Sequence, residues 1–109
     1  MTPDLKKAFK TRVNQWAQKI GVSVHSISLR TMSRKWASCS TAGNLTFDKT
    51  LLNLPTHLQD YVIVHELIHL KVPNHSYLWQ CLMMAHLGDY QTLEAELHKS
   101  ESRCSRNRK

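Results

Sequence analysis

The chain lacks the features that mark membrane and secreted proteins. No uninterrupted apolar stretch approaches the roughly 20 residues that a bilayer-spanning helix needs. The first residues, from Met1 to Lys7, contain no apolar core of the kind found in signal peptides. We therefore expect a cytoplasmic protein that does not insert into a membrane.

Cysteine is also scarce, and no repeat or linker divides the chain. Cys39, Cys81 and Cys104 are odd in number, widely separated and without C-x-x-C spacing, which argues against a disulfide framework and a zinc ribbon. The length of 109 residues suits one domain, and 41% hydrophobic with 21% charged residues is typical of a globular protein. We predict one domain over residues 1–100, a monomer with a single site.

Basic residues outnumber acidic ones, and the excess is uneven along the chain. The formal net charge is +7, and the last eleven residues contribute +4 of it. We interpret residues 101–109 as a basic tail. Such a tail binds nucleic-acid phosphates in a salt-dependent way, or it is simply a solvated terminus, and the sequence leaves both open.

Hydrophobic spacing in the first half predicts a helix followed by a small sheet. Residues 3–20 have helical spacing, and Gly21 is suited to end the helix. Residues 22–32 alternate as a strand does, with a change of phase near residues 25–26 that a bulge can absorb. A second strand is expected at residues 44–48 after a turn. We expect mostly antiparallel pairing in this sheet.

The second half is predicted to be helical. Thr56 and Gln59 have the spacing of a capping box at the start of the first helix, and Pro73 disfavours its continuation. A run of β-branched residues inside this helix favours a strand by propensity, but the length of the segment and the neighbouring motif indicate a buried helix. The predicted helices cover residues 55–72, 77–87 and 91–99. The whole is an α+β domain.

The segment His65-Glu66-Leu67-Ile68-His69 has the H-E-x-x-H pattern of zinc hydrolases. A helix turns about 100° per residue, so two histidines four apart lie about 40° from each other and can bind one ion. Glu66 lies beside the pair, where its carboxylate can hold and deprotonate a metal-bound water as general base. The alternative is that all three are ordinary helix residues, but polar groups in so apolar a helix are costly without a function.

Catalytic zinc takes three protein ligands and leaves one position open, so a third ligand is needed. His75 follows His69 by six residues, past the predicted helix end, where a reversal of the chain can return it to the site. We predict Zn²⁺ bound by His65, His69 and His75. His86, Tyr77 and Arg34 are further candidates, as a spare ligand or as donors that stabilise a tetrahedral intermediate.

The stretch from Arg34 to Gln80 resembles the YgjP-like branch of the SprT-like zinc metallopeptidases. The matching segments are Lys35-Trp36-Ala37-Ser38-Cys39, Asn44 to Phe47, Leu54-Pro55, Asp60-Tyr61-Val62, His65 to Leu70, and Asn74-His75-Ser76. Lys35 and Ala37 stand where that family has arginine and glycine, and Trp79-Gln80 stands where an aromatic pair is usual. The resemblance implies a zincin-like fold and a peptidase.

The resemblance also implies roles for individual residues. His65, His69 and His75 would bind zinc, and Glu66 would activate water. Asn44, Leu45 and Thr46 would belong to the edge strand along which zincins align an extended substrate. The short chain is also similar to the one-domain zincins called minigluzincins, whose third ligand is a glutamate; on that pattern Glu94 or Glu96 would replace His75.

Three functions remain as hypotheses. The first is hydrolysis of a peptide or protein substrate. The second keeps the metal but hydrolyses a nucleotide phosphoanhydride held by basic residues. The third is a non-catalytic module with structural zinc, which usually has four protein ligands, and a tail that binds nucleic acid.

Overall fold

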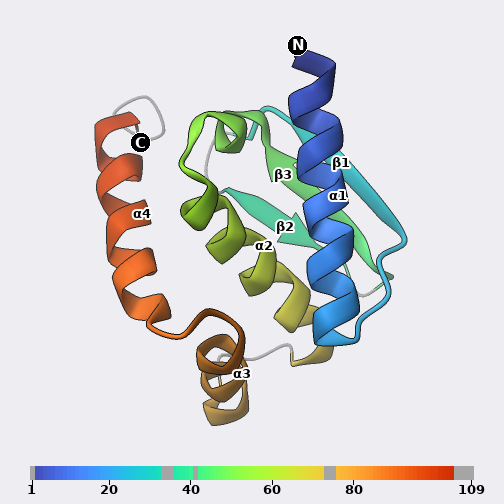
Figure 1. Ribbon diagram of the computed structural model, residues 1–109, viewed down its shortest axis with the longest axis vertical. Coiled ribbons are helices and arrows are strands. Elements are labelled where there is room, and N and C mark those ends of the chain that lie inside the picture. The colour runs from blue at the N-terminus through green and yellow to red at the C-terminus, as the bar shows by residue number, and fades with distance from the viewer. Residues whose placement is uncertain (1, 33–35, 41, 73–75, 105–109) are drawn as a thin grey trace.

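The computed structural model describes residues 2–32, 36–40, 42–72 and 76–104, and within them it is an α+β fold (Figure 1). Figure 1 shows α2 in the middle of the molecule, α1 beside it, the sheet behind both, and α3 and α4 on the remaining sides. The elements in chain order are α1 (Thr2–Ile20), β1 (Ser26–Arg30), β2 (Ala37–Cys39), β3 (Asn44–Asp48), the 3-10 helix η1 (Lys49–Asn53), α2 (Thr56–Lys71), α3 (Tyr77–Leu87) and α4 (Tyr90–Cys104).

Helix α1 packs on the sheet and on α2 through one apolar stripe. Phe9, Val13, Ala17 and Ile20 recur at intervals of three and four residues, and all are buried. The Phe9 ring meets the Phe47 ring of β3 edge-on, with centroids 5.0 Å apart. The helix predicted over residues 3–20 is therefore confirmed.

The sheet has three strands in the order β1-β3-β2, and its pairing is mixed. β2 and β3 pair antiparallel, whereas β1 and β3 pair parallel, with Ile27 opposite Leu45. A small sheet with mostly antiparallel pairing was predicted. The sheet is present, but only one of its two strand pairs is antiparallel. The hairpin at Gly43 fixes β3 antiparallel to β2, and β1 joins the free side of β3 in the parallel sense.

The first strand is shorter than predicted, because it begins after the change of phase. The amides of His25 and Ser26 both donate to the carbonyl of Gly43, at 2.8 and 3.3 Å. A Cβ on Gly43 would lie 3.1 Å from the backbone of both Ser23 and His25, so only glycine allows this close approach. Residues 22–25 therefore pack as an irregular segment, and regular pairing starts at Ser26.

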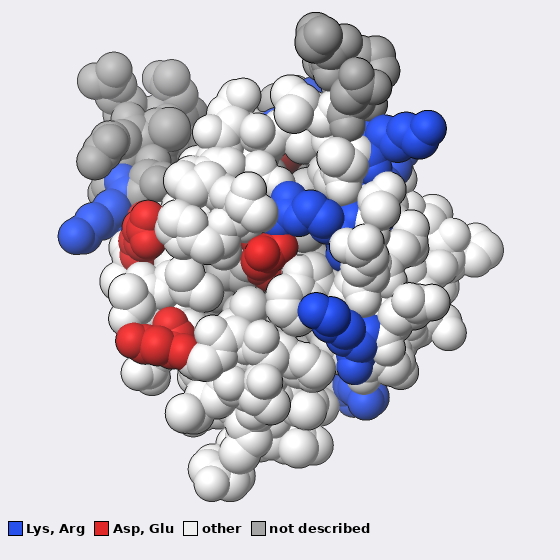
Figure 2. Space-filling model, in the orientation of Figure 1, with Lys and Arg blue, Asp and Glu red and all other residues white. Residues whose placement is uncertain are grey.

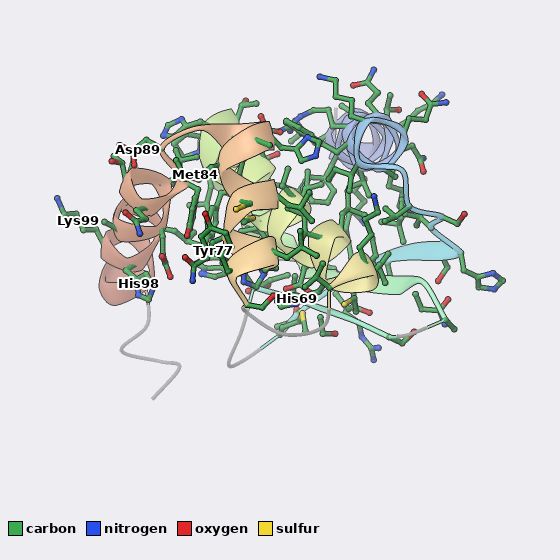
Figure 3. All side chains as sticks on the ribbon, turned by 90° about the horizontal axis from the view of Figure 1, so that it is seen from below. His69, Tyr77, Met84, Asp89, His98 and Lys99 are labelled. Atoms are coloured by element: carbon green, nitrogen blue, oxygen red, sulfur yellow. The ribbon has the colours of Figure 1, made fainter. Side chains whose placement is uncertain are left out.

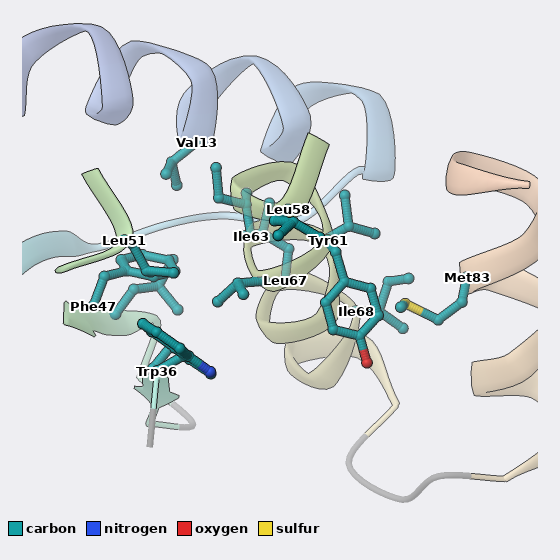
Figure 4. Close-up of a cluster of buried hydrophobic side chains, with 14 of the residues drawn as sticks. Val13, Trp36, Phe47, Leu51, Leu58, Tyr61, Ile63, Leu67, Ile68 and Met83 are labelled. Atoms are coloured by element: carbon teal, nitrogen blue, oxygen red, sulfur yellow. The ribbon is translucent and has the colours of Figure 1, made fainter. Parts of the chain in front are cut away.

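Helix α2 is buried on nearly every side, because it contacts α1, β2, α3 and α4. Figure 4 shows its side chains among those of the sheet, α1 and α3. Its start differs from the predicted capping box. Pro55 is the N-cap and Thr56 is the first helical residue, while the Gln59 amide donates to the carbonyl of Leu54 at 2.9 Å. Gln59 is drawn toward α1 because it also accepts a hydrogen bond from Arg12.

A polar clip joins α1 to the first half of α2. The Arg12 guanidinium donates to Gln59 at 2.7 Å and to the carbonyl of Thr56 at 3.1 Å, and it forms an ion pair with Asp60. The indole of Trp16 donates to the same Asp60 carboxylate at 3.1 Å. This clip sets the position of α2 along α1.

Helices α3 and α4 cover the other side of α2. α3 ends at Leu87, as predicted, and its C-cap Gly88 has a φ of 71° that suits glycine. Asp89 precedes α4 and accepts hydrogen bonds from the amide and hydroxyl of Thr92, at 3.3 and 2.6 Å. It ends at Cys104, so helical structure continues beyond the expected domain boundary at residue 100.

The surface charge is segregated on the face shown in Figure 2. Most of its basic side chains lie over α1, and its acidic ones lie over α2 and α4. Helix α1 thus carries basic surface in addition to that predicted for the tail. Within the described residues, no helix combines the length and apolar character that crossing a bilayer requires.

Replacing Arg12 with methionine should destabilise the protein. The change keeps an apolar stem but removes the donors to α2, and the Arg12 and Asp60 side chains are only 25% exposed. We expect a loss of about 1–3 kcal/mol in the free energy of unfolding, measured by urea denaturation. Gln15→Met, at an exposed position of the same helix, should change it by less than about 0.5 kcal/mol. Equal stability of the two variants would contradict the role of the clip.

Candidate metal site

Two histidines and a glutamate project from the second half of α2. The ring centroids of His65 and His69 lie 4.7 Å apart, with the rings at 76° to each other. The side chains of His65 and Glu66 are 24% and 12% exposed, so both are largely withdrawn from solvent. The structure therefore brings the two imidazoles together on adjacent turns, as the spacing predicts.

Each imidazole has one nitrogen directed at a nearby oxygen. Nδ1 of His65 lies 3.3 Å from Oε2 of Glu66, and Nδ1 of His69 lies 3.3 Å from the carbonyl oxygen of Val72. A proton on Nδ1 that is donated to these oxygens leaves Nε2 as the nitrogen able to bind a metal.

Glu66 has a carboxylate that its surroundings keep ionised. Burial raises the pKa of Glu66, but the hydrogen bond from His65, the charges of His65 and His69, and the thiol of Cys39 together lower it below its usual value. The carboxylate is therefore in the form that accepts a proton at neutral pH.

Aromatic side chains surround the two imidazoles. The Trp79 indole of α3 stacks on His69 and meets His65 edge-on, and Tyr61 of α2 lies 5.8 Å from His65, centroid to centroid. Burial, and then the charges of Glu94, Tyr90 and Glu66, raise the pKa of Tyr61 far above its usual value, so its hydroxyl stays protonated. These aromatics were not among the predicted site residues, although Tyr61 precedes His65 by one helical turn.

The two imidazoles supply part of the ligand set that a zinc ion needs. Two imidazoles suit zinc, but the described part of the chain holds no cluster of three His, Cys, Asp or Glu side chains able to bind a metal. His75 lies outside the described residues. The third ligand therefore stays a prediction.

The alternative ligands Glu94 and Glu96 have different neighbours. Glu96 contacts His57 at 2.9 Å, in the first turn of α2 and about 12 Å along the helix axis from His65. The charge of Glu94 raises the pKa of Tyr61, which lies one turn before His65.

Asn44, Leu45 and Thr46 were predicted to lie in an edge strand that aligns the substrate, and this predicted edge position is wrong. These residues lie in β3, which pairs with β1 on one side and β2 on the other, so both of its edges are occupied. β3 is central because Leu45 and Phe47 are fully buried in the core. Among the described strands, the outer strand beside the motif is β2, which packs against α2.

The remaining candidates lie apart from the motif or outside the described residues. His86 meets Trp16 of α1 edge-on, with ring centroids 6.3 Å apart. Tyr77, labelled in Figure 3, is 80% exposed at the start of α3. Arg34 lies outside the described residues.

Comparison with known proteins identifies a family for this chain. A family model for the YgjP-like metallopeptidase domain matches residues 1–100. No curated protein matches the chain.

Two solved structures share the fold. The metallopeptidase zymogen of Methanocaldococcus jannaschii jannalysin has a TM-score of 0.76 and 25% identity, over 84% of this chain and 95% of that one. The metallopeptidase zymogen of Pyrococcus abyssi abylysin has a TM-score of 0.73 and 22% identity, over 92% and 94%. With the motif on its central helix, the chain belongs to the YgjP-like metallopeptidase family.

Proposed function

We propose that this protein is a zinc-dependent peptidase in which His65 and His69 bind the metal and Glu66 is the general base. The observation that carries the proposal is the pairing of two imidazoles on adjacent turns with an ionised carboxylate beside them. Family membership supports the peptidase class and a divalent metal. His75 is proposed as the third ligand because its spacing from His69 suits a return of the chain to the site.

The chain's own groups supply proton transfer and orientation. A bound zinc ion contributes Lewis acidity toward the scissile carbonyl and the attacking water. Glu66 takes the proton of that water on a carboxylate oxygen and delivers it to the nitrogen of the leaving amine. Tyr61, protonated and with its ring beside that of His65, helps to enclose this side of the site.

An extended peptide would be aligned along β2. This strand pairs with β3 through Ala37, Ser38 and Cys39, and no described strand pairs with its other edge. The main-chain groups of an edge strand can pair with a substrate backbone regardless of its sequence. The thiol of Cys39, in β2, donates a hydrogen bond to the Glu66 carboxylate. A peptide aligned along β2 would therefore lie next to the proposed base.

Metal content and peptidase activity should separate the roles of the motif residues. We expect stoichiometric zinc in the wild type, loss of zinc in His65→Ala and His69→Ala, and retained zinc in Glu66→Gln. The glutamine cannot accept the proton, so Glu66→Gln should lower peptide hydrolysis by about 10²- to 10⁴-fold. Metal analysis and cleavage of an unfolded protein, with a chelator control, measure both.

The same assay addresses the nucleotide alternative. Nucleoside triphosphates are incubated with the same zinc-loaded protein, and zinc-dependent release of phosphate without peptide cleavage would contradict the proposal. The two solved structures described above are zymogens, so the metal measurement tests the site independently of latency. Wild-type protein that binds no zinc would overturn the assignment.

The third ligand can be identified by three single changes. His75→Ala should weaken zinc binding by more than the roughly 10- to 100-fold that loss of a supporting partner costs. Glu94→Ala should leave it nearly unchanged, and Glu96→Ala is the matched control because Glu96 pairs with His57. Zinc retained by His75→Ala and lost by Glu94→Ala would assign the ligand to Glu94.

Removing the thiol of Cys39 should raise the pKa of Glu66 in the metal-free protein. The thiol donates to the carboxylate and favours its ionised form, so Cys39→Val should shift the titration of Glu66 upward, whereas Cys39→Ser keeps a donor. Carboxyl ¹³C shifts followed against pH measure this. Cys81→Ser, at an exposed position of α3, is the control, and no shift in Cys39→Val would contradict the contact.

A further inference from the structure

A single indole contacts both imidazoles of the motif. The Trp79 ring is nearly parallel to His69, at 26° with centroids 5.8 Å apart, and nearly perpendicular to His65, at 82° and 5.3 Å. The two imidazoles are themselves 76° apart. One ring from α3 therefore limits rotation of both rings on α2.

The imidazoles need this restraint. A histidine side chain rotates about two bonds, and both rings must be aimed at one ion before binding, or the cost of ordering them reduces the affinity. Their Nδ1 contacts, both 3.3 Å, are longer than a typical hydrogen bond and fix the rings only weakly. Packing against Trp79 adds a constraint on the ring planes that these contacts do not supply.

Trp79 is itself held in place by the core. It is 6% exposed, and Met83, one turn later on α3, is fully buried. Tyr90, at the start of α4, meets the indole edge-on at 85°, with centroids 5.8 Å apart. Since Tyr90 is only 7% exposed, the indole is supported from behind by another buried ring.

We propose that Trp79 is a positioning residue that sets the planes of His65 and His69 for metal binding, with Tyr90 as its support. The inference rests on the proposed function, in which these histidines are metal ligands. It makes metal affinity depend on the docking of α3 and α4 against α2, and not only on the motif helix.

The test compares zinc affinity among variants of the full chain. Trp79→Leu keeps apolar bulk but removes the ring, and we expect zinc binding about 10-fold weaker, measured by competition with a chromophoric chelator. Trp79→Phe restores an aromatic face against His69 and should stay within about threefold of the wild type. The visible spectrum of the Co²⁺-substituted protein should change in Trp79→Leu and be restored in Trp79→Phe.

Trp16→Leu is the matched control. It removes an indole that contacts Asp60 and the His86 ring instead of the motif imidazoles. We expect a lower melting temperature with unchanged zinc affinity and an unchanged Co²⁺ spectrum. A loss of affinity in this variant as large as in Trp79→Leu would show a general effect of destabilisation and overturn the proposal.

The remaining outcomes are also decisive. If the wild type binds no zinc, the proposed function fails; if it binds zinc and folded Trp79→Leu binds equally well, only the role of Trp79 fails. Should Trp79→Leu not fold, Tyr90→Leu carries the test, because it leaves the indole but removes its support. We then expect zinc binding at least about threefold weaker, and unchanged binding in that folded variant overturns the proposal.

Discussion

Helix α2 must be buried on nearly all sides and still carry two imidazoles and a carboxylate. Burial of such groups is costly unless each has a partner, and the structure supplies partners from α2 itself, from β2 and from α3. Glu66 meets His65 and the thiol of Cys39 from β2, and the imidazoles meet the indole of Trp79 from α3. The contacts made by the surrounding elements offset the cost of burying these polar groups on α2.

The two halves of α2 are stabilised in different ways. Its first half is bound to α1 by the charged and polar groups around Arg12 and Asp60, where exposure to solvent is moderate. Its second half is lined by aromatic rings and by β2. Glu66 lies in this second half with a side chain only 12% exposed, and electrostatic interactions are stronger for a group so withdrawn from water.

The sequence predicted those features that depend on local spacing. The apolar stripe of α1, the end of α3 at Leu87 and the relation of His65 to His69 follow from local sequence pattern and were confirmed. The central place of β3 was not predictable from local sequence. It arises because β1 pairs with β3, which follows β2 in the chain, and not with β2 itself. Gln59 was read as part of a cap because nothing local shows that Arg12 competes for it. Whether His75 completes the metal site stays a prediction.

The composition of α2 has a consequence for how the protein folds. Its stretch Tyr61-Val62-Ile63-Val64 has low intrinsic helix propensity, so the helix depends on tertiary partners to form. The hydrogen bonds that hold it to α1 join residues 44 to 51 positions apart. In addition, β1 pairs with β3, although β2 lies between these two strands in the sequence. Long-range contacts of this kind slow folding. A fragment consisting of α2 alone would contain His65, Glu66 and His69 but would lack the contacts that make it helical, so the site is a product of the complete fold.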